Sequence, residues 1–216
     1  MEVLEYLACP GTAARPGRAM TPRYITIHNT ANTNQGAGAM SHARYLRGAG
    51  KNKAVSYHYA VDDECAVRIL PDTENAWHAG DGANGTGNRQ SLAIEVCENP
   101  ESDLAKATDN AAELTARLMR EWCIPVENVV QHHRWSGKNC PRRLRRGEPY
   151  SWETFLDKVR MFYNGTAETS GPEKPGTGDT LHTVQTGAFQ SRANAEAYAA
   201  DLNKRGVETY ITAKEG

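Results

Sequence analysis

The chain has no long apolar segment: none of its 216 residues fall in a run approaching the roughly 20 apolar residues that a membrane-spanning helix needs. It also lacks an excess of either charge, since 25 Lys and Arg stand against 26 Asp and Glu, for a formal net charge of -1. A chain without a strong overall field is not drawn to polyanions or lipid surfaces. We therefore expect no nucleic-acid partner and no insertion into a membrane.

The N-terminal segment lacks a secretory signal. Residues 1–7 (Met-Glu-Val-Leu-Glu-Tyr-Leu) do not show a basic stretch followed by an apolar one. This predicts synthesis in the cytoplasm without a signal peptide. A protein of this kind that acts outside the cell would leave by another route.

The cysteines lack the even number and regular spacing of a disulfide framework. There are five of them, which favours reduced thiols. We expect Cys140 to be a metal ligand and the others to behave as small buried hydrophobes. These others are Cys9, Cys65, Cys97 and Cys123.

Apolar periodicity divides most of the chain into strands and helices. Alternating patterns predict strands at 23–28, 55–61, 66–70, 91–97 and 129–130. Three- and four-residue spacings predict helices at 39–47, at 104–123 and from Ser151, a good N-cap. Residues 79–90 hold four glycines and read as a long loop. Strands interleaved with helices indicate an α/β domain over residues 1–163.

The C-terminal part has a different composition. Residues 164–180 contain no large apolar side chain and are predicted to be a flexible linker. Residues 181–216 follow a strand–helix–strand pattern, which predicts a small βαβ unit. A unit of about 35 residues is too small to bury its own apolar face reliably. We expect it to need a partner, such as a second copy in a homodimer.

Residues 131–141 combine an imidazole, an ammonium and a thiol in one loop (Gln-His-His-Arg-Trp-Ser-Gly-Lys-Asn-Cys-Pro). His132 and Cys140 are too far apart for one helical turn, so a folded loop must bring them together. Both are good zinc ligands, and His28 ends another apolar strand. Three protein ligands leave a fourth position for water, as in a catalytic zinc site. His28 could instead be a hydrogen-bonded strand-end histidine, and a structural site would need a fourth ligand, for which Cys97 is the best candidate.

Two charged side chains could act beside such a metal. Lys138 could stabilise negative charge that develops next to the metal. Glu95 lies in the middle of an otherwise apolar strand, where a carboxylate is rare without a partner or a purpose. Burial would raise its pKa and a cation would lower it, which suits a general base. The alternative is a solvent-facing Glu95 on the polar side of an edge strand.

For other aromatic and imidazole side chains, the sequence indicates a role in a binding cleft less clearly. Tyr57 and His58 are consecutive in a predicted strand, so only one can face a given cleft and the other packs in the core. Trp77 and His78 open the glycine-rich loop, which suits a sugar or peptide cleft as well as ordinary packing.

We expect the remaining polar clusters to be exposed. His42 and His133 have no pattern that points to a site. The basic run at 142, 143, 145 and 146 is predicted to be a solvated surface, with an anion-binding rim as the alternative.

Five ordered segments carry a family resemblance. Residues 28–32, 56–62, 76–82, 94–99 and 131–141 resemble the zinc-dependent N-acetylmuramoyl-L-alanine amidases. The likeness runs from about Tyr24 to Arg145 and is to the type-2 amidases of phage endolysins and Bacillus-type cell-wall lysins, which are related to the peptidoglycan-recognition proteins. The resemblance implies a central mixed β-sheet flanked by helices. It also implies cleavage of the amide between N-acetylmuramic acid and L-alanine in peptidoglycan.

By motif position, the resemblance assigns roles to individual residues. The implied zinc ligands are His28, His132 and Cys140. The implied general base is Glu95, the implied oxyanion-stabilising lysine is Lys138, and an active-site tyrosine of some relatives falls on Tyr57. Candidates for contacts with substrate in the groove are Asn29, Trp77 and His78.

The tail resembles one half of the sporulation-related repeat, the SPOR domain, which binds peptidoglycan. The likeness is carried by residues 184–189 and 194–198 and by Leu202. The family builds its domain from two βαβ halves, and this chain shows the first. As a whole the sequence predicts a phage endolysin that waits in the cytoplasm until lysis, with a bacterial autolysin or sporulation amidase, or a non-catalytic peptidoglycan-recognition module, as the alternatives.

Overall fold

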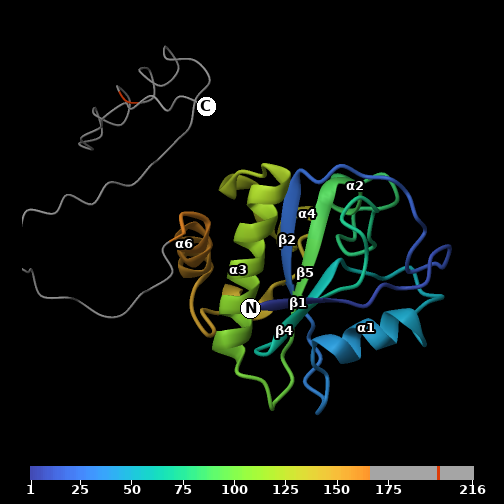
Figure 1. Cartoon of the computed structure of the whole chain (residues 1–216), viewed down its shortest axis with the longest axis horizontal. Helices are drawn as coiled ribbons and strands as arrows, with labels where there is room; N and C mark the ends of the chain where they lie inside the picture. The colour runs from blue at the N-terminus through green and yellow to red at the C-terminus, as the bar shows by residue number, and fades with distance from the viewer. Residues whose placement is uncertain (166–198, 200–216) are drawn as a thin grey trace, which may run out of the picture. The chain divides into compact units, whose positions relative to one another are not determined.

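The computed structural model describes residues 1–165 and 199 (Figure 1). The chain divides into two units, Met1–Thr169 and Ser170–Gly216, and nearly all described residues belong to the first. The predicted linker at 164–180 and the predicted βαβ unit at 181–216 lie outside the described residues, apart from residues 164, 165 and 199. In the part of the chain that is described, no helix is long and apolar enough to cross a membrane.

A six-stranded mixed sheet forms the centre of the described domain, in the order β1-β4-β3-β5-β2-β6. Only the β3–β4 pair is antiparallel among these strands. The predicted mixed α/β fold is confirmed. The strands are β1 (Glu2–Glu5), β2 (Tyr24–Asn29), β3 (Tyr59–Val61), β4 (Cys65–Arg68), β5 (Ser91–Val96) and β6 (Val129–Gln131).

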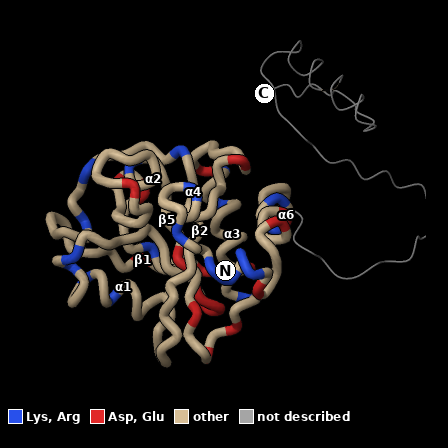
Figure 2. Tube along the Cα trace, turned by 180° about the vertical axis from the view of Figure 1, so that it is seen from behind, with Lys and Arg blue, Asp and Glu red and all other residues tan. Residues whose placement is uncertain are grey.

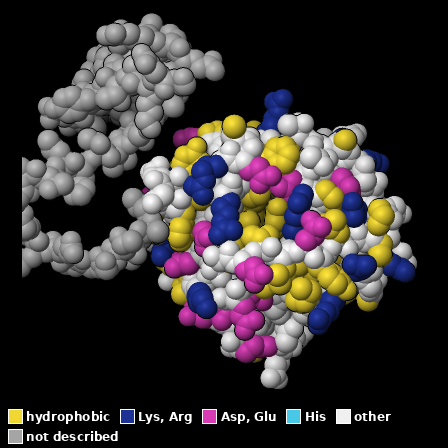
Figure 3. Space-filling model, in the orientation of Figure 1, with side chains coloured by type: hydrophobic (Ala, Val, Ile, Leu, Met, Phe, Trp, Pro, Cys, Tyr) yellow, Lys and Arg dark blue, Asp and Glu magenta, His cyan; other side chains and the backbone are white. Residues whose placement is uncertain are grey.

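Helices cover both faces of the sheet. The longest helix among the described residues, α3, packs with α6 on one face, and α1 lies on the other (Figure 1). Helix α6 carries acidic and basic positions, and both signs are interspersed on the face in Figure 3 (Figures 2 and 3). The helices are α1 (Ala39–Arg47), α2 (Thr86–Gln90), α3 (Leu104–Trp122), α4 (His133–Ser136), α5 (Arg142–Arg145) and α6 (Trp152–Tyr163), with a 3-10 turn at Val126–Asn128.

Strand β5 separates the two cores. Its even-numbered apolar residues, Leu92, Ile94 and Val96, join the core under α3 and α6. Ala93 and Cys97 join the core under α1. Since β5 lies between β3 and β2, the alternative that placed Glu95 on an edge strand is wrong.

Three sequence expectations about secondary structure are corrected. The strand predicted at 55–61 begins only at Tyr59, because Ser56 is hydrogen-bonded to the Trp77 backbone rather than to a neighbouring strand. The loop predicted at 79–90 contains helix α2. Strand β1 was not predicted, because its residues do not alternate between buried and exposed. This pattern is expected for a short strand at the edge of a sheet.

The cysteines are free thiols, but their burial is not uniform. Cys97 and Cys140 are buried, and Cys9 and Cys65 are half-buried. Cys123 is exposed, so the expectation of a buried thiol is wrong there. It follows the last residue of α3 in the left-handed conformation that ends the helix, with φ of 52°.

Both long helices begin with a side-chain cap. Ser151 accepts a hydrogen bond from the Thr154 amide, as predicted for the start of α6. Asp103 accepts from the amides of Ala105 and Lys106 at the start of α3. These caps satisfy amides that have no partner inside the helix.

Removing the cap of α3 is expected to destabilise the domain. Asp103→Ala leaves two amides without their acceptor, and we expect a loss of about 1 kcal/mol in the free energy of unfolding. Urea unfolding followed by circular dichroism measures this difference. Asp103→Asn is the matched control because Asn caps equally well. An equal loss in both variants would show that the charge, not the cap, stabilises the helix.

Candidate metal centre

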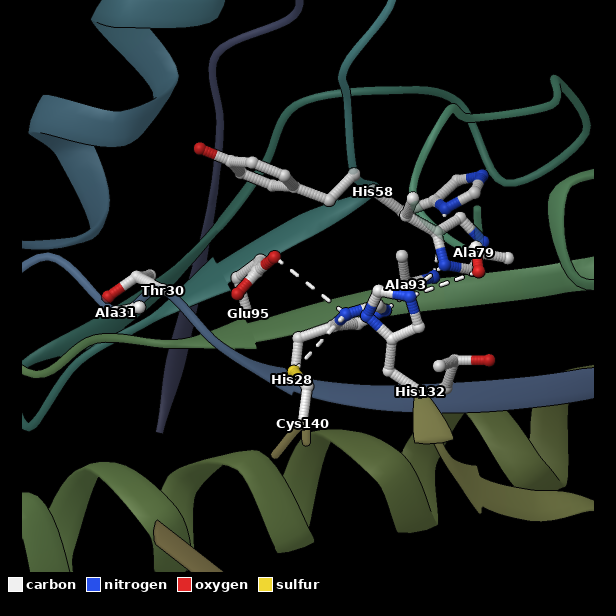
Figure 4. A network of polar contacts seen from close by, with 12 residues as sticks. His28, Thr30, Ala31, His58, Ala79, Ala93, Glu95, His132 and Cys140 are labelled. Atoms are coloured by element: carbon white, nitrogen blue, oxygen red, sulfur yellow. Dashed lines mark hydrogen bonds and ion pairs between the residues drawn. The ribbon is translucent and has the colours of Figure 1, made fainter. Parts of the chain in front are cut away.

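Two histidines and a cysteine from separate elements meet at one edge of the sheet. His28 lies near the end of β2, His132 directly follows β6, and Cys140 precedes α5. Because β2 and β6 are parallel neighbours, their carboxyl ends lie at the same edge. One ligand atom from each side chain lies within 4.8 Å of the others, and all three residues are buried. Figure 4 shows Cys140 and Glu95 pointing toward the His28 ring.

The donor atoms fit a zinc ion. The Nδ1 atom of His132 is buried without a hydrogen-bond partner, while its Nε2 atom lies 3.0 Å from the Ala79 carbonyl oxygen. The Nδ1 atom of His28 lies 3.8 Å from the Cys140 sulfur. Two imidazoles and a thiol are a donor set that zinc prefers. Among the described residues, Cys97 is not part of this group, so the alternative of a closed four-ligand site gains no support from it.

Burial sets the protonation of these groups in the metal-free protein. It lowers the pKa of both His28 and His132, and the Lys138 ammonium lowers both further. Burial also raises the pKa of the Cys140 thiol to about 11. The imidazoles are therefore neutral near pH 7, which is the form that ligates a metal.

Glu95 is a carboxylate beside this centre. It is in register with His28 on the neighbouring strand, and its Oε1 atom lies 3.9 Å from the His28 Nδ1 atom. Its Oε2 atom is buried and has no hydrogen-bond partner. Burial raises the pKa of Glu95 to about 8, against the opposing effect of the Lys138 ammonium. A carboxylate with a free oxygen and a pKa near neutrality suits proton transfer.

A cavity of about 860 Å³ opens over the three ligands. Lys138 is exposed and lines this cavity, so its ammonium can reach a bound molecule. Trp77 is half-buried in the wall, and the Arg18 guanidinium lies 5.7 Å above its ring centre. Asn29 also lines the cavity, but its side-chain oxygen accepts a hydrogen bond from the Arg143 amide.

Tyr57 faces the cavity and His58 faces the core. The Tyr57 hydroxyl lies 2.9 Å from the Nδ1 atom of His42, and burial raises the pKa of Tyr57 well above its ordinary value. His42 is therefore half-buried and bonded, which corrects the expectation that it is exposed. His133 is exposed as predicted. His78 lines the cavity, but its Nδ1 atom is 3.0 Å from the Nε2 atom of His28.

Comparison with known proteins identifies the family. The family described as N-acetylmuramoyl-L-alanine amidase matches residues 18–143, more than half of the chain. The chain belongs to this family. The SPOR domain family matches residues 178–216, where the tail resembles that repeat.

This amidase-family chain is similar to two Bacillus subtilis proteins. It is 49% identical over 160 residues to the amidase CwlH, covering 74% of this chain and 59% of that protein. It is 53% identical over 145 residues to the amidase XlyA, covering 67% of this chain and 46% of that protein. The chain thus spans about half the length of these curated relatives.

Solved structures show the same fold. The catalytic domain of XlyA is 48% identical with a TM-score of 0.69, and the match covers 74% of this chain and 99% of that one. The solution structure of the PlyG catalytic domain is 39% identical with a TM-score of 0.67, covering 79% of this chain and 100% of that one.

In this amidase-family domain, part of the basic run is not a solvated surface. Arg142 and Arg143 form ion pairs with Glu98 at 3.0 Å and 2.8 Å. The Glu98 side chain is fully buried and also accepts from the Ala31 amide. These contacts hold the segment after Cys140 against the end of β5. Glu98 belongs to the 94–99 motif, but its role could be recognised only with its partners in place.

The buried His58 ring is expected to make the free energy of unfolding depend on pH. Its Nδ1 atom accepts from the Ala93 amide at 3.0 Å, and its Nε2 atom donates to the Glu74 carbonyl. Burial lowers the pKa of His58, so the native state disfavours the charged ring. Stability from this group is therefore complete above the unfolded pKa of about 6.5 and is lost as the pH falls below it, by at most about 1.4 kcal/mol per pH unit.

The measurement is the free energy of unfolding of chelator-treated protein at pH 7.5 and pH 5. His58→Gln can keep one donor and one acceptor without titrating, so its loss of stability over this range is expected to be smaller than that of the parent. An equal loss in both proteins would assign the acid sensitivity to other groups.

Proposed function

We propose that this chain is a zinc-dependent hydrolase that cuts the amide between N-acetylmuramic acid and L-alanine in peptidoglycan. The observation that carries the proposal is the arrangement of two neutral imidazoles and a thiol within 4.8 Å, beside a carboxylate with an unpartnered oxygen. The family match and the relatives named as amidases support the choice of bond. The residues that would hold zinc are His28, His132 and Cys140.

The chemistry requires addition of water to an amide carbonyl. When bound, zinc supplies Lewis acidity at the carbonyl and lowers the pKa of water. Glu95 takes a proton as the water oxygen forms its bond to the lactyl carbonyl carbon. Lys138 then faces the negative charge on the carbonyl oxygen, where a preorganised cation stabilises the transition state. Glu95 returns the proton to the alanine nitrogen as the carbon–nitrogen bond breaks, leaving a lactyl carboxylate and a free amino terminus.

The cavity walls would position the substrate. Trp77 offers an aromatic face to a sugar or peptide, as such rings commonly do in mostly apolar binding sites. The Tyr57 hydroxyl stays protonated because of its raised pKa and can act as a hydrogen-bond donor. Asn29 and His78 contribute to the same wall, although each already has a protein partner.

We further propose that the biological setting is the release of a phage endolysin at lysis, with a bacterial autolysin or sporulation amidase as the alternative. A structure described as a mutant endolysin from Bacillus subtilis is 48% identical to this chain and supports the first setting. The SPOR match at 178–216 supports a tail that binds peptidoglycan. Whether this tail pairs with a second copy can be tested by measuring the mass of the full chain in solution.

The experiment for the proposed activity is metal analysis combined with digestion of purified peptidoglycan. We expect one zinc per chain, release of soluble wall fragments, loss of that release with chelator, and recovery when zinc is added back. A protein that carries zinc but releases nothing would fit a recognition module instead. Release that survives complete removal of zinc would contradict the metal-dependent mechanism.

A further inference from the structure

Both metal-site histidines are bonded through their outer nitrogen to two consecutive residues. The Nε2 atom of His28 lies 3.0 Å from the Nδ1 atom of His78. The Nε2 atom of His132 lies 3.0 Å from the carbonyl oxygen of Ala79. Figure 4 shows Ala79 beside His132, on the side of the ring away from Cys140. One short segment therefore contacts both imidazoles on the side opposite to the metal position.

The Asn88 side chain holds this segment from one side. The Oδ1 atom of Asn88 accepts from the amides of His78 and Ala79, at 2.8 Å and 2.9 Å. Asn88 is itself only 3% exposed, and its Nδ2 atom donates to the Gly82 carbonyl. Since one amide oxygen bonds both backbone groups, Asn88 fixes the position of both acceptors together.

The start of α2 is bonded to the residues that follow Ala79. Asp81 accepts from the amides of Gly87 and Asn88, at 2.6 Å and 3.2 Å. A Cβ atom on Gly87 would lie only 2.4 Å from the Ala79 side chain, so the Gly87 backbone packs too closely against Ala79 for any larger residue at position 87. The His78–Ala79 segment is thus held by Asn88 on one side and by the packing of α2 on the other.

The consequence for His132 is a fixed tautomer. A neutral imidazole carries its proton on one nitrogen and a lone pair on the other. The Ala79 carbonyl can only accept, so the proton of His132 lies on Nε2 and the lone pair on Nδ1. If the Nδ1 atom of His78 accepts in the same way, the lone pair of His28 also lies on Nδ1, which is the atom near the Cys140 sulfur.

We propose that Asn88 is a positioning residue of the zinc centre: by holding the His78–Ala79 acceptor pair, it keeps both ligand histidines oriented and in the metal-binding tautomer. Partners of this kind typically change metal affinity by about 10- to 100-fold. The proposal rests on the zinc site proposed above. It adds a residue that makes no contact with the metal and lies outside the motifs with which the sequence was matched.

The test compares zinc dissociation constants of full-length variants by competition with a chromogenic chelator. Asn88→Ala is expected to weaken zinc binding by about 10- to 100-fold. Asn88→Asp keeps an oxygen that can accept from both amides but loses the donor to the Gly82 carbonyl, and is expected to recover part of the affinity. Asn75→Ala is the matched control, because Asn75 is fully buried and its side chain has no hydrogen-bond partner among the described residues.

Two further measurements separate positioning from folding. Circular dichroism and urea unfolding of the zinc-free variants report the fold without the metal. If zinc-free Asn88→Ala does not fold, His78→Phe removes the acceptor for His28 while keeping the Asn88 bonds, and is expected to weaken zinc binding by about 10-fold. The visible spectrum of the cobalt-loaded protein should change in both variants, because the ligand geometry changes.

The outcomes are distinct. If both Asn88→Ala and His78→Phe bind zinc as tightly as the parent protein, the proposal is overturned. It is also overturned if Asn75→Ala weakens zinc binding as much as Asn88→Ala does. If the parent protein binds no zinc, the proposed function fails first, and the two failures are thereby told apart.

Discussion

Glu95→Gln is expected to keep zinc and the fold while lowering amide hydrolysis by about 100- to 10 000-fold, the usual contribution of a general base. Gln has the same shape but no basic oxygen. The oxygen it replaces is buried and unpartnered beside His28, so the substitution breaks no hydrogen bond of the folded protein. The carboxylate of this residue is the proton carrier in the proposed reaction.

The measurement is the initial rate of fragment release from purified peptidoglycan, with zinc content and melting temperature determined on the same samples. Glu64→Gln is the control, because Glu64 is exposed and lies outside the cavity lining. Hydrolysis at the parent rate in Glu95→Gln would remove this residue as the base. Loss of zinc from the variant would instead assign Glu95 to the metal site.

Cys140→Ser is expected to weaken zinc binding by more than roughly 100-fold and to abolish hydrolysis at low zinc concentration, because a hydroxyl is a much poorer zinc ligand than a thiolate. The Cys140 sulfur is the only thiol in the group of ligand atoms found among the described residues. Equilibrium dialysis against buffered zinc measures the change.

Cys97→Ser makes the same chemical change at another buried thiol and serves as the control. Cys97 packs in the core under α1, and its replacement is expected to leave zinc stoichiometry at one per chain. A loss of zinc from Cys97→Ser would indicate a four-ligand structural site. Full zinc binding by Cys140→Ser would contradict the ligand set.

Much of the domain could be predicted because its periodicity is clear. Strand β5 alternates between two buried faces, and helix α3 has an apolar stripe that ends close to the predicted residues. Such signals depend only on local spacing. The segment before Tyr59 shows where they fail: it has the composition of a strand, but its partner is the backbone of Trp77.

In the metal centre, too, local sequence signals identify some residues, while contacts made by the fold identify others. His28, His132 and Cys140 could be proposed from residue type and from their places at strand ends. The contacts of His78, Asn88 and Glu98 could not, because their partners are brought to them by the fold. For His42, an exposed position was expected since nothing in the neighbouring sequence indicates the Tyr57 hydroxyl that it contacts.

The identity of the bond that is cut can be measured directly. Purified peptidoglycan is digested with the zinc-loaded full chain, and new amino termini and new reducing sugars are both quantified. We expect N-terminal L-alanine as the new amino terminus, in step with solubilisation and without new reducing sugars. New reducing sugars, or amino termini of another residue, would contradict it.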